Sequence, residues 1–184
     1  EGFSINLENN AIGQREYANQ RDSNRMEKIL MINLRGGLKS KYIDLGVKLA
    51  LEKRYVKCQI DKASNEEDAL YLAENQTYNR IIMVEPFIEG DESKQVREES
   101  ISTLYSAMDI IKSSGATDTQ QTSFTYLGPD LNAKQKLKLE IGSPYQGSNF
   151  EVLSYRSGEN WEKNTVNVYD DSIRAKGEKF AREY

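Results

Sequence analysis

The sequence predicts an α/β protein built around a partly parallel sheet, and three observations support that fold class. Two dense apolar runs, Glu27 to Leu34 and Asn79 to Ile88, have the length and β-branched content of buried strands. A third run, Tyr55 to Asp61, alternates like a strand nearer an edge. Because helix-like segments separate these runs, residues 27–88 predict strand, helix, strand, helix, strand with parallel pairing.

The run from Asn79 to Ile88 is expected to be the central strand. Its four consecutive apolar residues, Ile81 to Val84, suit a strand that is covered on both faces. Pro86 lacks a ladder donor, so the strand should end near it. A shared core is expected to bury residues from all three strands and both helices: Ile32, Leu45, Leu49, Leu70, Ile82 and Val84.

Two helices are predicted between these strands. Leu38, Tyr42, Leu45 and Leu49 recur at helical spacing, which predicts a helix over residues 38–53. The second helix is predicted over residues 65–75, because Ser64 and Glu67 have the spacing of a capping box.

The second half is expected to add antiparallel hairpins and a C-terminal helix, giving it α+β character. Residues 101–112 fit either a helix or a strand. The strand is favoured, because a Ser-Ser-Gly turn then leads into the strand-like run at 121–127. Residues 137–141 and 150–155 predict a second hairpin, and a final helix is expected over residues 170–184.

The domain organisation predicted is an extended N-terminal arm, residues 1–26, followed by a single α/β domain, residues 27–184. The chain starts at Glu1 rather than Met, which suits either a removed signal peptide or an artificial boundary. With 25 basic and 29 acidic residues, the net charge is −4, which disfavours a nucleic-acid partner. No apolar run approaches the roughly 20 residues of a transmembrane helix, so none is expected.

No catalytic residue, cofactor or metal site is predicted, and the protein is expected not to be an enzyme. Histidine is absent, which removes Ser-His and Cys-His pairs and histidine-bearing zinc sites. The single cysteine, Cys58, is expected to be a buried structural thiol. The pair Gly36-Gly37 lacks phosphate-loop spacing. Glu85, Glu89, Asp91 and Glu92 are expected to form a solvated acidic loop, since their spacing matches no calcium loop.

Partner binding by strand addition is predicted instead; the alternative is that the arm and the hairpin complete the sheet of their own domain. The arm alternates at Phe3, Ile5 and Leu7 but is too short to be stable alone. The strand from Phe150 to Tyr155 has only Glu151 to protect an open edge. The expected partners are proteins, within a homo-oligomer or a multi-subunit assembly. The residues assigned to this role are Phe3, Ile5, Leu7, Phe150, Val152 and Tyr155.

The order KILMINL, helix, YVKCQID, a helix opening SNEEDALYLA, and YNRIIMVEPFIE resembles a group of bacterial envelope domains. These are the amino-terminal domain of the Tol-Pal translocation protein and the curli-secretion lipoprotein, in which hairpins follow the third strand. The resemblance implies a non-enzymatic assembly component that is periplasmic or associated with the outer membrane. Two alternatives are a structural subunit of a viral or secretion machine and a small α/β enzyme that uses carboxylates.

Overall fold

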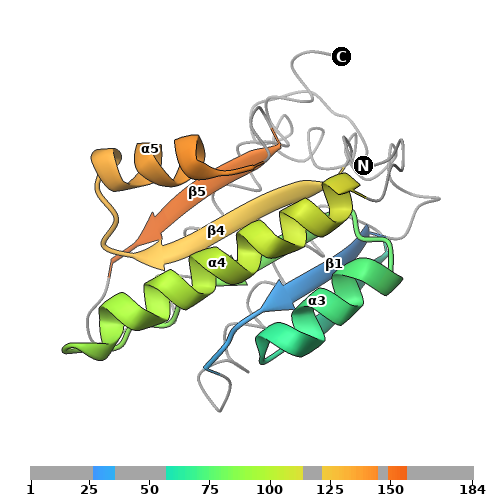
Figure 1. Ribbon diagram of the computed structural model, residues 1–184, viewed down its shortest axis with the longest axis horizontal. Coiled ribbons are helices and arrows are strands. Elements are labelled where there is room, and N and C mark those ends of the chain that lie inside the picture. The colour runs from blue at the N-terminus through green and yellow to red at the C-terminus, as the bar shows by residue number, and fades with distance from the viewer. Residues whose placement is uncertain (1–26, 36–56, 114–121, 145–148, 157–184) are drawn as a thin grey trace, which may run out of the picture.

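The computed structural model describes residues 27–35, 57–113, 122–144 and 149–156. In these ranges strands and helices alternate along the chain (Figure 1). Their bounds are β1 (Glu27–Ile32), β2 (Cys58–Ala63), α3 (Glu66–Asn75), β3 (Arg80–Val84), α4 (Glu92–Ser113), β4 (Ser123–Pro129), α5 (Ala133–Gly142) and β5 (Phe150–Tyr155).

All the described strands form one sheet in which every neighbouring pair is parallel. The strand order is β2-β1-β3-β4-β5, so β3 lies in the middle, as predicted. This is the flavodoxin-like order of doubly wound α/β proteins, in which the chain reverses direction across the sheet between β1 and β3. The α/β class is therefore confirmed, and the sheet is parallel throughout its described part.

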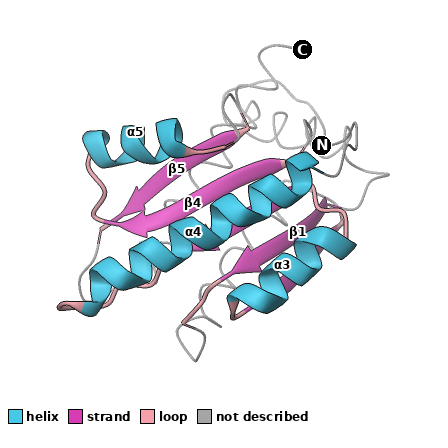
Figure 2. Ribbon diagram, viewed as in Figure 1, coloured by secondary structure: helices cyan, strands magenta, loops and turns pink. Residues whose placement is uncertain are grey.

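The sheet is buried on both faces. Figure 2 shows α3, α4 and α5 on one face, where Leu30, Ile81 and Phe124 belong to their apolar core. Side chains on the other face, among them Ile29, Ile82 and Val84, are equally inaccessible.

The predicted core is confirmed in part: its strand residues are buried, but Ile32 packs in the helix-side cluster whereas Ile82 and Val84 pack in the cluster on the other face. Ile32, Ile82 and Val84 are fully buried. Leu70 is only partly buried, at the margin of the helix-side core. Leu45 and Leu49 lie outside the described residues, as do the helix predicted at 38–53, the N-terminal arm and the final helix.

Residues 101–112 are helical, so the preference for a strand there is wrong. They form the second half of α4, a helix of 22 residues that begins at Glu92. Its buried face includes Val96, Ser100, Leu104 and Met108, each four residues from the next. The helical spacing is hard to recognise before Ile101, because most residues there are polar or charged and lie on the exposed side of the first turns of α4.

The antiparallel hairpins are also wrong, because β4 pairs parallel to β3 and β5 pairs parallel to β4. Parallel neighbours need a crossover, and α5 supplies it where a strand had been predicted at 137–141. Asn132 caps α5 through a capping box: its side chain accepts from Gln135 N at 2.8 Å, and its own N donates to Gln135 Oε1 at 3.0 Å.

Capping also corrects the start of α3. The N-cap is Asn65, whose side chain accepts a hydrogen bond from Asp68 N at 2.8 Å, rather than Ser64. Asparagine is among the best N-cap residues, and it lies directly before the acidic first turn.

Candidate functional site

The carboxyl ends of the parallel strands form the edge at which doubly wound sheets place their ligands. Glu85 lies directly after β3 at this edge, and its N donates to Leu127 O at 2.9 Å, extending the pairing by one residue. Pro86 follows and has no N–H to continue the ladder. The backbone therefore fixes Glu85 where β3 leaves the sheet.

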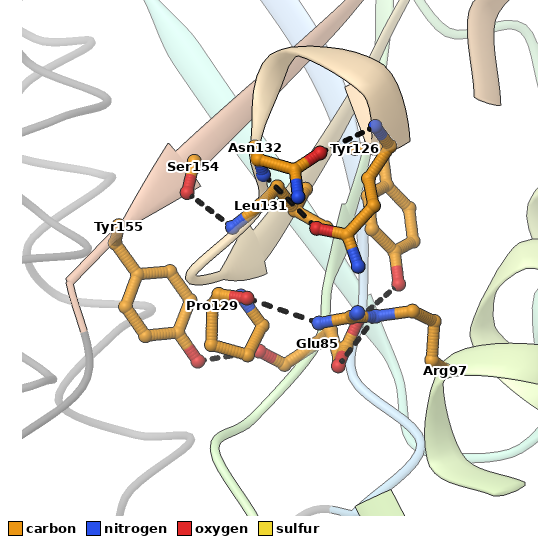
Figure 3. Close-up of polar contacts among 9 residues, drawn as sticks. Glu85, Arg97, Tyr126, Pro129, Leu131, Asn132, Ser154 and Tyr155 are labelled. Carbon is orange, nitrogen blue, oxygen red and sulfur yellow. Dashed lines mark hydrogen bonds and ion pairs between the residues drawn. The ribbon is translucent and has the colours of Figure 1, made fainter. Parts of the chain in front are cut away.

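Glu85 is the centre of a buried polar cluster (Figure 3). Arg97 Nε, from α4, donates to Glu85 Oε1 at 3.0 Å and to Oε2 at 3.2 Å. The hydroxyl of Tyr126, from β4, donates to Glu85 Oε1. The carboxylate side chain is only 2% exposed, so these charge-assisted bonds replace the water that it loses on folding.

Two further bonds connect the cluster to β4 and β5. Arg97 Nη2 donates to Pro129 O at 3.0 Å. The hydroxyl of Tyr155 donates to the backbone oxygen of Glu85 at 2.7 Å. The cluster of Glu85, Arg97, Tyr126, Pro129 and Tyr155 thus joins the ends of three strands to α4 (Figure 3).

Charge and burial set the protonation of the cluster. Burial alone would lower the pKa of Arg97, but the hydrogen bonds and charge of Glu85 raise it above its ordinary value. Burial, reinforced by the charge of Glu85, raises the pKa of Tyr126 far above that of an exposed tyrosine. Arg97 therefore remains a cation, and Tyr126 remains a neutral donor.

The turn after β4 is adapted to this crowded arrangement. A side chain on Gly128 would place its Cβ 2.9 Å from the ring of Tyr126 and 3.2 Å from Glu85 Oε1. Asp130 has a left-handed backbone, φ 52°, and its N donates to Tyr155 O at 2.8 Å. The glycine permits the close approach, and the aspartate turns the chain away from the sheet.

A cavity of about 530 Å³ opens beside the cluster, between the loop after β3, the first turns of α4 and the turn after β4. Its volume is in the range of small-molecule sites. Ser93, Lys94 and Arg97 line it from α4, and Glu89 and Asp130 contribute carboxylates. One side of the Arg97 guanidinium is bound to the cluster. The Arg97 side chain is nevertheless 28% exposed and also lines the cavity.

Glu85 was predicted to lie in a solvated acidic loop, and this prediction is wrong: its side chain is buried and bonded to Arg97 and Tyr126. Glu89 lines the cavity instead. Within the described ranges, no group of three or more His, Cys, Asp or Glu residues could hold a metal ion.

Of the residues predicted to bind partners, the structure describes those on β5: Phe150 and Val152 do not line this cavity, and Tyr155 belongs to the cluster. Phe150, Val152 and Tyr155 are on β5, an outer strand of the described sheet, and their side chains are buried. Strand addition at β5 would use the backbone of that strand rather than these buried side chains, and it remains a prediction. Phe3, Ile5 and Leu7 lie outside the described residues. Cys58 is half-buried rather than fully buried.

Sequence reasoning missed Arg97, Lys94 and Tyr126. The sequence pattern predicts no element immediately before residue 101, whereas Arg97 and Lys94 lie on the first turns of α4. The four-residue spacing of Val96, Ser100 and Leu104 was the signal that would have placed them on a helix. Tyr126 was assigned to a strand, but no pattern in the sequence indicates that its hydroxyl meets Glu85.

No family model matches the sequence, and no curated protein matches it significantly. Solved structures do match. One is a CheY-like response regulator receiver domain from Methanospirillum hungatei, with 12% identity over 84% of this chain and 98% of that chain, and a TM-score of 0.45. A flavodoxin-like domain from Synechococcus has 14% identity, covers 84% and 99% of the two chains, and has a TM-score of 0.45.

A third match is a Burkholderia pseudomallei response regulator with a phosphorylated aspartic acid, a calcium ion and citrate. It has 12% identity over 82% of this chain and 72% of that chain, with a TM-score of 0.45.

The resemblance to the Tol-Pal and curli-secretion envelope domains is wrong. It depended on hairpins after the third strand, and parallel strands stand in their place. The envelope assembly function and the periplasmic or outer-membrane location were implied by that resemblance and are wrong with it. The alternative of a viral or secretion-machine subunit relied on the same hairpins, which are absent from the described sheet. The alternative of an enzyme that uses carboxylates has no support at Glu85, which is bonded to Arg97 and Tyr126. Among the described helices, none is long and apolar enough to span a membrane.

Proposed function

We propose that this protein is a ligand-binding module that takes a small organic anion into the cavity between the β3–α4 loop and the β4–α5 turn. One observation carries the proposal: Arg97 is fixed in place by Glu85 and Pro129 O, yet its side chain lines the cavity and is 28% exposed. An arginine held in this way can recognise an anion without losing much side-chain entropy.

The donors of Arg97 are only partly used. Its guanidinium carries five N–H groups, and Nε and one Nη2 hydrogen are engaged by Glu85 and Pro129 O. The end of the guanidinium, where an Nη1 hydrogen and the second Nη2 hydrogen point in parallel, could then meet a planar acceptor such as a carboxylate or a phosphate. Lys94 lies three residues earlier on α4 and also lines the cavity, so its ammonium adds a second cation within reach.

The other lining residues narrow the class of ligand. Glu89 and Asp130 face the cavity with carboxylates, which would repel a simple anion but would accept hydrogen bonds from hydroxyl groups. Phe87 and Ile88 add apolar surface. A small phosphate or carboxylate that also carries hydroxyl groups, of the size and polarity of a sugar phosphate, satisfies these three features together.

The cluster favours a binding function over a catalytic one. Glu85 accepts hydrogen bonds from Arg97 and Tyr126, which oppose its use as a base.

The test is a titration of the full chain with ribose 5-phosphate, inorganic phosphate and ribose, followed by amide NMR shifts and by melting temperature. We expect ribose 5-phosphate to give saturable shifts at Ser93, Lys94 and Asp130 and to raise the melting temperature, since a ligand at 100 times its Kd stabilises by about 2.7 kcal/mol. Phosphate should bind more weakly, and ribose should have no effect.

Lys94→Ala should weaken ribose 5-phosphate binding by about tenfold, or about 1.4 kcal/mol. Lys112→Ala, at the far end of the same helix, is the matched control and should bind as the wild type does. The proposal is overturned if neither anion shifts the cavity residues, or if Lys94→Ala and Lys112→Ala have equal affinities.

A further inference from the structure

The large apolar side chains that are exposed in the described ranges occur on only two elements. Tyr71, on α3, is 65% exposed, and Leu137 and Ile141, on α5, are 56% and 64% exposed. Leu137 and Ile141 are four residues apart, so they are neighbours on one face of α5. Single exposed apolar residues are common on protein surfaces, but the charges around these three differ in an informative way.

The two helices have opposite charge. The acidic residues of α3 are Glu66, Glu67, Asp68 and Glu74, and it has no basic residue. The basic residues of α5 are Lys134, Lys136 and Lys138, against the single acid Glu140. Formal charges are therefore −4 on α3 and, from three lysines and one glutamate, +2 on α5.

Charge and apolar surface coincide on each helix. Glu67 and Glu74 are four residues before and three residues after Tyr71, so carboxylates flank its ring. Lys134 and Lys138 lie three residues before and one residue after Leu137 and are exposed. An apolar centre with a charged border is the usual anatomy of a protein interface, and these two centres have complementary borders.

The two surfaces cannot meet within one molecule. α3 packs against α4 and lies over the β1–β2 side of the sheet, whereas α5 packs against β5 at the opposite side, with α4 between them (Figures 1 and 2). A contact between the acidic and the basic helix therefore requires a second copy.

We propose that α3 of one copy docks on α5 of another, with Tyr71 packing on Leu137 and Ile141 and with Glu67 and Glu74 facing Lys134 and Lys138. The contact is head-to-tail, because each copy offers two different surfaces. It leads to a closed ring or to a growing chain of copies, according to the rotation between neighbours. Its small apolar centre makes the association weak and dependent on concentration.

Sedimentation of the full chain from about 10 µM to about 1 mM should give an average mass that rises with concentration. Raising the salt to about 0.5 M should lower that mass, because the flanking charges are exposed and screened. Leu137→Glu should keep the protein at the mass of one chain, as should Tyr71→Glu. Both positions are exposed, so melting temperatures should remain close to that of the wild type.

A charge exchange tests the pairing itself. Glu67→Lys with Glu74→Lys, and separately Lys134→Glu with Lys138→Glu, should each abolish self-association, whereas mixing the two double variants should restore a complex. Lys57→Glu, a change of the same type at an exposed position outside both helices, should have no effect.

The proposal is overturned if the wild type stays at the mass of one chain up to about 1 mM. It is equally overturned if Leu137→Glu abolishes association while Tyr71→Glu does not, because the contact would then join two α5 helices. Binding of α5 to an added acidic peptide without any self-association would assign this surface to a different partner and would also overturn it.

Discussion

The two ends of the parallel sheet each contain a buried pair of a glutamate and an arginine, and the two pairs differ in how they are enclosed. At the amino end, Arg80 Nε donates to Glu27 Oε2 at 3.3 Å, with side chains 9% and 3% exposed. At the carboxyl end, Arg97 Nε donates to Glu85 Oε1 at 3.0 Å, but the arginine is 28% exposed. The first pair is sealed inside the protein, and the second opens on a cavity.

This difference separates a structural pair from one that can also bind. Glu27 and Arg80 are the first residues of β1 and β3, so their contact joins neighbouring strands. Arg97 comes from a helix instead, and its position leaves donors directed away from Glu85. A buried ion pair is weak evidence for function by itself; the partial exposure of one partner, next to a cavity, is what distinguishes the carboxyl end.

The largest effect is expected from removing the arginine of each pair. Arg80→Met should destabilise the protein by about 3–5 kcal/mol, because it removes the buried cation with which the Glu27 carboxylate is paired. Arg97→Met should cost less, about 2 kcal/mol, since water reaches that end and Tyr126 still donates to Glu85. Urea unfolding of both variants measures the two free energies. Equal losses would contradict the distinction between a sealed and an open pair.

An intermediate effect is expected at Gly128, which has no counterpart at the amino end. Gly128→Ala should cost about 1–3 kcal/mol, because its Cβ would lie 2.9 Å from the buried ring of Tyr126, which has little room to move. Gly142→Ala is the matched control. Its Cβ would meet Tyr105 Oη at an ordinary 3.5 Å, so its stability should be unchanged or slightly higher. Thermal melting of the two variants distinguishes a crowded site from a general effect of added methyl groups.

The fold could be predicted from sequence wherever hydrophobic period and element length agreed. β1 and β3 were placed within a few residues of their observed bounds because their apolar pattern is dense and local, and α3 because its capping signal is local. The α4 and α5 helices were missed for a physical reason. Both helices expose polar and charged side chains over most of their surface. In α5 the apolar residues Leu137, Leu139 and Ile141 alternate as they would in a strand, and only Leu139 is buried within its bounds.

The candidate site was less predictable than the fold, because it depends on register between distant segments. Glu85 and Arg97 are twelve residues apart, and Tyr126 and Tyr155 are further along the chain. Their side chains meet only because β3, β4 and β5 are parallel and end at the same edge. The predicted hairpins pair β4 and β5 with other segments rather than with β3 and with each other. No pattern in the sequence could therefore have brought these residues together.

The smallest effect is expected at a second tyrosine–carboxylate contact, which resembles Tyr126–Glu85 but has a carboxylate that is only partly buried. The hydroxyl of Tyr78 donates to Asp61 Oδ2 at 2.7 Å and lowers the pKa of Asp61 below its ordinary value of 3.8. A carboxylate with a lowered folded pKa contributes stability that is present above its unfolded pKa and is lost as pH falls through the folded pKa.

Tyr78→Phe removes only the hydroxyl, so the wild type should be slightly more stable than this variant at pH 7, and the difference should shrink below about pH 4. Solvent screening keeps the effect small, because Asp61 is only partly buried. In an Asp61→Asn background the same substitution should have an effect that does not vary with pH. Urea unfolding at a series of pH values checks both expectations, and a difference that persists unchanged to pH 2 would mean that Tyr78 acts through packing rather than through the charge of Asp61.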